Sequence, residues 1–378
     1  MSFIYLLYVA VLGALIGSFA NVVIYRLPLG KSVVWPRSSC PHCSRTLSVL
    51  DLVPIFSWLF LKGRCRSCQQ PISFRYPFIE LLMALGFLVL AWRFPVERYG
   101  FSLLIILTIF AMFLIMSMID IDTYTIPDSL SLPALLISLL ASFLLAANLL
   151  PNFSDALFGA SLAAGVIALI NRVGSLVLRR FKDTKERLWP IGMDQLNIAA
   201  LGGALLSWQL GLGLALLSLV LNFITRKTLR LSEPVLYLLW FISLALIVYN
   251  PFTTPFKALS GTFVAAGAVA MLGALFWWFY DIFSKNQLPE LEEDLDEPIA
   301  MGFGDVKLAA IMGALLGWQN FLFAFVVAVC LGAIGGIIGK FLSGNRQVPF
   351  GPYLAVATFV ALFVAQPAIT WYLGQLGF

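Results

Sequence analysis

The chain has 378 residues, of which 61% are hydrophobic and only 11% are charged, and its mean hydropathy is +0.94. This composition excludes a soluble globular domain, which could not accommodate so large a share of apolar side chains. The net charge of +5 comes from basic residues scattered through connecting loops, so it indicates membrane topology and not nucleic-acid binding. We therefore predict an all-α polytopic membrane protein.

Apolar runs recur along the chain at lengths close to the roughly 20 residues that span a bilayer as a helix. Residues 1–25 form the first run, with no charge ahead of Arg26, which predicts an uncleaved transmembrane segment with its N-terminus outside. Further runs include residues 101–119, 130–150 and 309–338. We expect about twelve apolar segments in total. Two of them, after Gly192 and Gly302, are short enough to be half-spans.

The loop over residues 26–76 is predicted to be cytoplasmic and to bind a metal. Its Lys and Arg residues outnumber its single acid, Asp51, as the positive-inside rule predicts for a cytoplasmic loop. Two CxxC pairs separated by a short excursion have the spacing of a structural four-thiolate zinc site, with ligands Cys40, Cys43, Cys65 and Cys68. A redox role is less favoured, because no βαβ pattern surrounds either pair. His42, inside the first pair, is expected to be a solvated bystander.

Residues 77–128 are predicted to form a transmembrane pair that ends in an acidic loop. This loop reads DIDTYTIPD over residues 120–128, and positive-inside topology places it on the cytoplasmic side. Asp120 directly follows the apolar run, where a helix can hold it rigidly, and Asp122 competes with it. Glu80, near the start of the first span, is either an interfacial residue or a third polar group near the site.

The rest of the chain contains an internal parallel duplication. Residues 191–208 align without gaps on residues 301–318, and segments beginning at Ala156 and Ala258 also match. We divide this part into a first copy over 129–230, a second copy over 231–348 and a final transmembrane segment over 349–378. Gln195 and Asn197 of the first copy occupy the places of Asp305 and Lys307, so the first copy is expected to be structural or to shape the substrate site. Asp194 lies one residue before the position that is equivalent to Asp305.

The sequence GFGDVK over residues 302–307 is the only place where an acid follows two glycines at the mouth of an apolar segment. A carboxylate at a membrane edge is expensive to keep and indicates function, and Gly302 and Gly304 permit a close backbone approach. If Asp305 approaches Asp120 in a low-dielectric site, one pKa rises, and the pair can activate water while polarising a carbonyl. We predict this aspartic-protease dyad, with Gly302, Gly304, Lys307 and Asp122 in support.

These motifs together resemble the type IV prepilin peptidases, which are membrane aspartic proteases of the GxGD type. The resemblance covers GSFANVVIYRLP over residues 17–28, the CxxC pairs, RYPFIE over 75–80, the two aspartate segments and PFGP over 349–352. It implies catalytic Asp120 and Asp305, zinc on the four cysteines, and a bacterial inner-membrane location with the active site facing the cytoplasm.

The implied activity is cleavage of the leader peptide of type IV prepilins or type II secretion pseudopilins after a glycine. Recognition would involve the leader and the apolar helix that follows it. The resemblance further implies N-methylation of the new N-terminus with S-adenosylmethionine, associated with residues 26–76. No glycine-rich cofactor fingerprint is present in this chain.

Two alternatives come from other functional classes. Parallel repeats, short broken helices and membrane acids are also features of secondary cation-coupled transporters, although the equivalent acid is missing from the first copy. A catalytically inactive pilus or secretion assembly factor is the other alternative, and its function would survive loss of Asp305.

Overall fold

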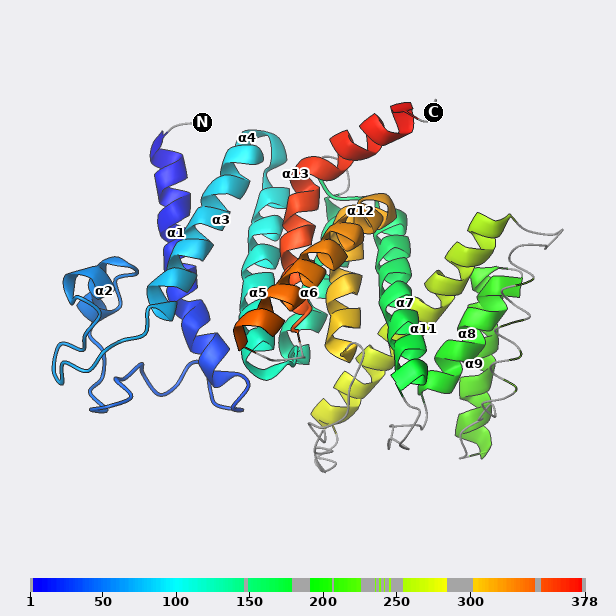
Figure 1. The fold of residues 1–378 in the computed structure, drawn as a ribbon, viewed down its shortest axis with the longest axis horizontal. Coiled ribbons are helices and arrows are strands. Elements are labelled where there is room, and N and C mark those ends of the chain that lie inside the picture. Colours follow the sequence, from blue (N-terminus) through cyan, green and yellow to red (C-terminus); the bar gives the residue numbers. More distant parts are fainter. Residues whose placement is uncertain are drawn as a thin grey trace. The chain divides into compact units, whose positions relative to one another are not determined.

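The computed structural model describes residues 3–145, 149–178, 191–205, 207–225, 254–283, 302–343 and 348–375, with four isolated positions between 226 and 253. The regular elements among these residues are helices, and none of these residues forms a β-strand (Figure 1). Extended pairing among them is limited to two isolated bridges, Ser39 with Thr46 and Arg64 with Pro71. The chain divides into two compact units, Met1–Leu150 and Pro151–Phe378, and each is described by itself.

The first unit contains four long helices joined by short ones. Its long helices are α1 (Phe3–Arg26), α3 (Arg75–Arg93), α5 (Phe101–Thr123) and α6 (Asp128–Leu144), and its short helices are η1 (Val49–Asp51), α2 (Phe56–Phe60) and α4 (Val96–Tyr99). The second unit contains α7 (Phe153–Leu178), α8 (Met193–Leu205), α9 (Trp208–Thr225), α11 (Pro255–Phe283), α12 (Phe303–Ser343) and α13 (Gly351–Gln375).

Eight of the described helices are long and apolar enough to cross a membrane, namely α1, α3, α5, α7, α9, α11, α12 and α13. Helix α6 is apolar but shorter. Many of their large apolar side chains are exposed, as is expected where lipid and not water is the solvent. These helices confirm the predicted polytopic all-α membrane protein. The expected segment between residues 231 and 250 lies outside the described residues, apart from the four isolated positions.

Helices α1 and α3 pack closely because α1 presents small residues to its neighbour. A Cβ atom on Gly17 would lie 2.7 Å from the Cα atom of Glu80, and one on Gly13 would lie 2.8 Å from the carbonyl oxygen of Met83. One turn beyond Gly17, the Asn21 amide donates a hydrogen bond to the carbonyl oxygen of Tyr76 at 3.2 Å. Small residues with an added interhelical hydrogen bond are a common device for joining membrane helices.

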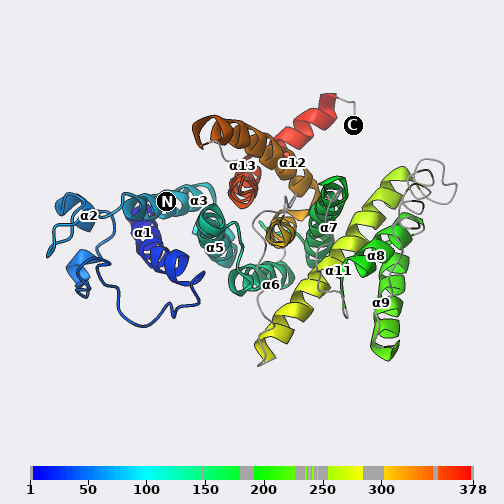
Figure 2. The same ribbon diagram turned by 60° about the horizontal axis from the view of Figure 1, so that its bottom comes forward.

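The duplicated copies interlock in the second unit. By sequence, α7 corresponds to α11, and α8 and α9 correspond to the two halves of α12. However, α7 packs against α12, while α11 packs against α8 and α9 (Figures 1 and 2). Gly159 of α7 lies against Gly313 of α12. The equivalent glycines, Gly261 of α11 and Gly203 of α8, lie against each other in the same way.

A pseudo-two-fold axis passes between α7 and α11. A Cβ atom on Gly165 of α7 would collide with the carbonyl oxygen of Phe263, and one on Gly267 of α11 would collide with the carbonyl oxygen of Ser161. Gly165 and Gly267 occupy equivalent positions, and so do Ser161 and Phe263. The equivalent helices α7 and α11 therefore cross at equivalent points, and each copy covers the other.

The short apolar segments after Gly192 and Gly302 differ in how they end. Helix α8 has 13 residues and is followed by α9, whereas α12 continues through a kink at Gly317, whose φ is 73°. Ser207, immediately before α9, is the equivalent of Gly317. The break therefore recurs at the same register in both copies, and glycine permits it in the second because it tolerates a positive φ.

Candidate active site and metal centre

Asp120 lies on the buried face of the last turn of α5, not in the loop that the sequence suggested. Helix α5 continues to Thr123, and Tyr124 ends it in the left-handed conformation with its N–H donating to the Asp120 carbonyl oxygen at 2.9 Å. The Asp120 residue is only 5% exposed. A helix thus fixes the backbone of this acid, as predicted, and the helix extends one turn further than the apolar pattern.

Asp122 is committed to an ion pair with Arg75 at the start of α3. The two guanidinium nitrogens donate to the two carboxylate oxygens at 2.6 and 2.8 Å, and Arg75 also donates to the Met118 carbonyl oxygen at 3.3 Å. The Asp122 side chain is 36% exposed. This two-pronged pair engages both carboxylate oxygens, so Asp122 would have to break its contact with Arg75 before it could act on a substrate.

Asp305 lies in the first turn of α12, behind Gly302 and Gly304. It is 7% exposed, and its N–H donates to the Gly302 carbonyl oxygen at 3.1 Å. The partial positive charge of the helix N-terminus favours a carboxylate there. The Lys307 ammonium group lies over the Phe303 ring, 5.6 Å from its centroid, so a cation–π contact holds this lysine near the same turn.

Gln195 occupies the equivalent position on α8 and caps that helix. Its side-chain oxygen accepts a hydrogen bond from the Gly192 N–H at 2.9 Å, as a residue at the third helical position does in a capping box. Gln195 is 1% exposed. The first copy thus keeps the fold of the turn while lacking the ionisable group.

The Sγ atoms of Cys40, Cys43, Cys65 and Cys68 all lie within 4.8 Å of one another. The separation between Cys40 and Cys68 is 3.8 Å, close to the ~3.8 Å expected between sulfurs on a tetrahedral ion with bonds of about 2.3 Å. All four cysteines are free of disulfides. The predicted ligands therefore come together as a cluster that fits a metal ion.

The two CxxC turns have the same backbone geometry. In the first, the Cys40 N–H donates to the Arg45 carbonyl oxygen at 2.9 Å, and in the second the Cys65 N–H donates to that of Gln70 at 2.9 Å. Ser44 and Gln69, at matching positions, both have a positive φ. Each turn thus presents two thiols toward the same point, so the site is built from two equivalent halves.

Electrostatics around the cluster distinguish its thiols. N–H groups of Cys68 and Ser67 stabilise the Cys65 thiolate and lower its pKa to about 6. The Gln70 N–H lowers the pKa of Cys68, but burial and the neighbouring cysteines outweigh it and raise that pKa to about 11. Four thiolates in one place repel one another, and a bound dication relieves this repulsion.

Residues 26–75 also contain an ion-pair centre that the sequence did not reveal. Asp51 accepts hydrogen bonds from the Ser48 hydroxyl at 2.7 Å and the Ser48 N–H at 3.1 Å. Its carboxylate also lies 2.9 Å from the Arg66 Nε atom and 4.0 Å from an Arg45 guanidinium nitrogen. Because Arg45 and Arg66 belong to different CxxC turns, Asp51 joins the two halves. The one feature of the sequence that could have indicated this ion-pair centre is that Asp51 is the only acid of the loop.

The family model described as "Bacterial Peptidase A24 N-terminal domain" matches residues 11–94. The model described as "Type IV leader peptidase family" matches twice, over residues 105–227 and 226–337, which together make up more than half of the chain. The chain belongs to the type IV leader peptidase family. The double match agrees with the duplication seen in the sequence and in the interlocked helices.

Curated relatives agree with this assignment. A prepilin leader peptidase/N-methyltransferase of Stutzerimonas stutzeri is 34% identical over 391 residues, which cover 96% of this chain and 92% of the relative. One from Aeromonas hydrophila is 26% identical, with 99% and 95% covered. One from Myxococcus xanthus is 36% identical over 213 residues, with 56% and 59% covered. No solved structure gives a significant match.

Within this leader peptidase fold, Glu80 connects α3 to the cysteine-rich loop. It is 8% exposed, and its carboxylate accepts a hydrogen bond from the Ile55 N–H at 2.6 Å. Glu80 is therefore a buried structural acceptor and not a snorkelling interfacial residue. The sequence suggested an interfacial residue or a third polar group near the site, and it did not reveal this contact because the partner is a backbone group distant in the chain.

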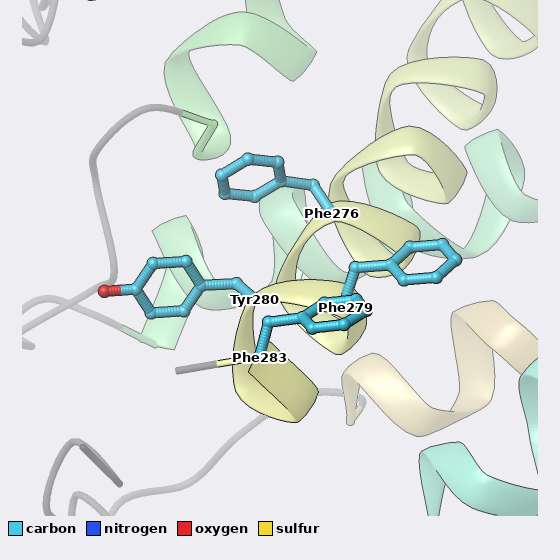
Figure 3. Close-up of a pocket in the computed structure, with 4 residues that line it drawn as sticks. All are labelled: Phe276, Phe279, Tyr280 and Phe283. Atoms are coloured by element: carbon cyan, nitrogen blue, oxygen red, sulfur yellow. The ribbon is translucent and has the colours of Figure 1, made fainter. Parts of the chain in front are cut away.

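A cavity of about 440 Å³ lies at the end of α11, lined by Phe276, Phe279, Tyr280 and Phe283 (Figure 3). The lining is apolar except for the phenol of Tyr280. Aromatic side chains of this kind gather where a membrane helix meets the interface. The cavity supplies no group for peptide hydrolysis, so we assign it no part in the chemistry.

Proposed function

We propose that this leader peptidase family member is a membrane aspartic endopeptidase that removes the leader of type IV prepilins or type II secretion pseudopilins after a glycine. The observation that carries the proposal is the different environment of the three candidate acids. Asp120 and Asp305 are both buried on helix turns, whereas Asp122 is paired with Arg75. The names of the relatives support the substrate class and also favour the peptidase over a transporter or an inactive assembly factor.

In the proposed mechanism, Asp120 and Asp305 share one proton. The ionised carboxylate accepts a proton from water, whose oxygen attacks the scissile carbonyl carbon, while the protonated carboxyl group donates to the carbonyl oxygen. Collapse of the tetrahedral intermediate breaks the C–N bond, and the proton taken from water goes to the leaving amine. The two aspartates belong to different units, so their pairing stays a prediction.

The names of the relatives also support N-methylation of the new N-terminal residue with S-adenosylmethionine as the methyl donor. The described residues contain no strand–glycine loop–helix arrangement that would cradle such a cofactor. We therefore derive no step through it. Zinc in the cysteine cluster is supported by the sulfur spacing and by the four-thiolate donor set, and its role there would be to stabilise the loop.

The proposed location is the bacterial inner membrane, with the aspartates on the cytoplasmic side. The excess of basic residues in the cysteine-rich loop supports this orientation. Arg75, in that loop, pairs with Asp122 at the end of α5, so the loop and the first acidic segment lie at the same end of the first unit.

The test is cleavage of a purified prepilin by the full-length protein in membranes. Asp120→Asn and Asp305→Asn should each lower the rate by at least about 10²-fold, the contribution typical of acid–base catalysis. Asp194→Asn should cleave normally, and Asp122→Asn should retain activity. Zinc content and thermal stability serve as folding controls. Cleavage that survives Asp305→Asn would refute the dyad, and methyl transfer from labelled S-adenosylmethionine tests the second activity.

A further inference from the structure

The excursion between the two CxxC turns, residues 49–60, exposes large apolar side chains. Phe56 is 58% exposed, Leu59 55% and Phe60 83%, and Val49 and Leu50 are exposed to a similar extent. A water-facing loop seldom displays so many apolar side chains next to one another. The remainder of the 26–75 loop is rich in basic residues, and it also exposes apolar side chains at Val34 and Trp35.

The contact with Glu80 determines the depth of this excursion along α3. Glu80 lies five residues inside the helix that begins at Arg75, which corresponds to about 7.5 Å along the axis at 1.5 Å per residue. Its carboxylate holds the Ile55 N–H. Figure 1 shows α2 beside the turns of α3 and not beyond its end. The tip of the excursion is therefore level with a membrane-spanning helix.

Helix α1 indicates that the contact between Glu80 and Ile55 lies still deeper in the membrane. The Asn21 amide donates to the carbonyl oxygen of Tyr76, so Asn21 and the start of α3 are at one level. Arg26, the first basic residue on α1, lies about 7.5 Å further along. Basic residues at span ends extend to the headgroup region. Whether Arg75 or Arg26 marks that region, the backbone of Glu80, whose carboxylate accepts the Ile55 N–H, lies on the hydrocarbon side of it.

Backbone N–H groups at the tip have partners within the protein. Pro54 has no N–H, the Ile55 N–H bonds to Glu80, and the Phe56 N–H donates to the Pro54 carbonyl oxygen at 2.6 Å. The N–H groups of Ser57 and Leu59 donate to carbonyl oxygens within the excursion at 3.0 and 3.1 Å. Internal satisfaction of this kind is what a backbone needs in order to enter lipid.

The excursion is held rigidly and is flanked by positive charge. The Trp58 indole donates to the Ile72 carbonyl oxygen at 3.0 Å, and its ring meets Phe74 edge to face. Lys62 and Arg64 directly follow α2, and the single acid of the loop, Asp51, is paired with Arg66. Basic side chains beside an apolar tip favour a surface of anionic lipids.

We propose that residues 49–60 form a re-entrant element that enters the anionic leaflet beside α3, with Phe56, Leu59 and Phe60 in contact with acyl chains. The element attaches the metal-binding loop to the bilayer, and Glu80 closes the hydrogen bonding of its tip. This inference does not rest on the proposed peptidase activity.

The experiment places the photo-crosslinking residue p-benzoylphenylalanine at Phe60 in the full-length protein, reconstituted with zinc in lipid nanodiscs containing phosphatidylglycerol. The same residue at Leu85, a 46% exposed position within α3, provides the lipid-facing reference, and Gln70, an exposed position in the second CxxC turn, provides the comparison outside the excursion. Mass spectrometry identifies each adduct. Zinc content verifies that the loop is folded.

We expect a lipid adduct at Phe60 with a yield within about two-fold of that at Leu85, and a several-fold lower yield at Gln70. Discs made only of phosphatidylcholine should lower the yield at Phe60, and an equal yield would overturn the preference for anionic lipid. If the zinc-loaded protein gives no lipid adduct at Phe60, the proposed insertion of residues 49–60 into the bilayer is overturned. Exchange of the lipid adduct for a peptide adduct when prepilin is added would instead assign the surface to the substrate.

Discussion

At the scale of single residues, Asp120 and Asp122 show how two acids on one helix turn acquire different roles. Two positions along an α-helix differ by about 200° in direction. Asp120 consequently faces the interior, whereas Asp122 faces outward and meets Arg75. The sequence offered both acids as candidates. The ion pair with Arg75 distinguishes the roles of the two acids. The sequence could have predicted this pair only through the expectation that the start of α3 and the end of α5 lie at one level.

A residue-scale prediction concerns Asp51. The Ser48 hydroxyl, more than any other group, lowers the pKa of this carboxyl group below its usual 3.8, with help from Arg66 and Arg45. A lowered pKa means that the stabilisation is complete above about pH 3.8 and is lost as the pH falls through the folded-state value. Asp51→Asn should therefore speed metal release to a chelator at neutral pH several-fold. Asp155→Asn, on α7, is the control, and equal release rates would contradict the role of Asp51.

A second residue-scale prediction concerns Asn197, the counterpart of Lys307. Asn197 is fully buried, and no described group lies within hydrogen-bond reach of either atom of its amide. Removing an unsatisfied buried amide should stabilise the protein, so Asn197→Leu should raise the free energy of unfolding by about 1–3 kcal/mol. The matched variant Asn222→Leu replaces a fully buried asparagine that is not without a partner and should destabilise. Thermal unfolding in detergent measures both, and a lower melting temperature for Asn197→Leu would show that its amide has a partner.

At the scale of helices, close crossings set the positions of the functional turns. Helix α12, which carries Asp305, packs against α7, a helix of the other copy. The sequence identified the duplicated segments and their register through recurring glycines and tryptophans. It could not show that the copies exchange partners, because both pairings would bury the same small residues. Only the three-dimensional contacts of Gly159 with Gly313 distinguish the two arrangements.

The crossing of α7 and α11 gives an element-scale prediction. Gly267 has no room for a side chain, since a Cβ atom would collide with the Ser161 carbonyl oxygen. Gly267→Val should therefore separate the helices and cost more than about 3 kcal/mol, above the usual range for overpacking. Gly213→Val, at a helical glycine with open space around it, should change stability little. Thermal unfolding compares the two variants, and equal losses would argue against the tight crossing.

At the scale of the whole molecule, the sequence predicted the class of fold, the metal-binding cysteines and the family through local patterns. Cysteine spacing, apolar run lengths and the GFGDVK turn are all encoded within a few neighbouring residues. The Ile55–Glu80 and Arg75–Asp122 contacts join residues distant in the chain, and so no local pattern revealed them. No local pattern revealed the division into two units either. In that division the metal-binding loop belongs with α1 and α3, while Asp305 belongs to the interlocked repeat.

The interlocked repeat leads to a prediction about the inserted helices. Because α12 packs on α7 and α13 and makes little contact with α11, the helix that carries Asp305 keeps its main neighbours when α8, α9 and α11 are absent. Joining residue 178 to residue 302 through a short glycine–serine linker should therefore leave prepilin cleavage within about ten-fold of the full chain, which is about 1.4 kcal/mol in the barrier. The face of α7 that α11 now covers is apolar, and lipid can replace α11 there.

The matched deletion of residues 151–301 also removes α7 and should abolish cleavage. If the first deletion abolishes cleavage in a protein that still binds zinc and inserts in the membrane, the removed segment, residues 179–301, must contribute directly to the position of Asp305.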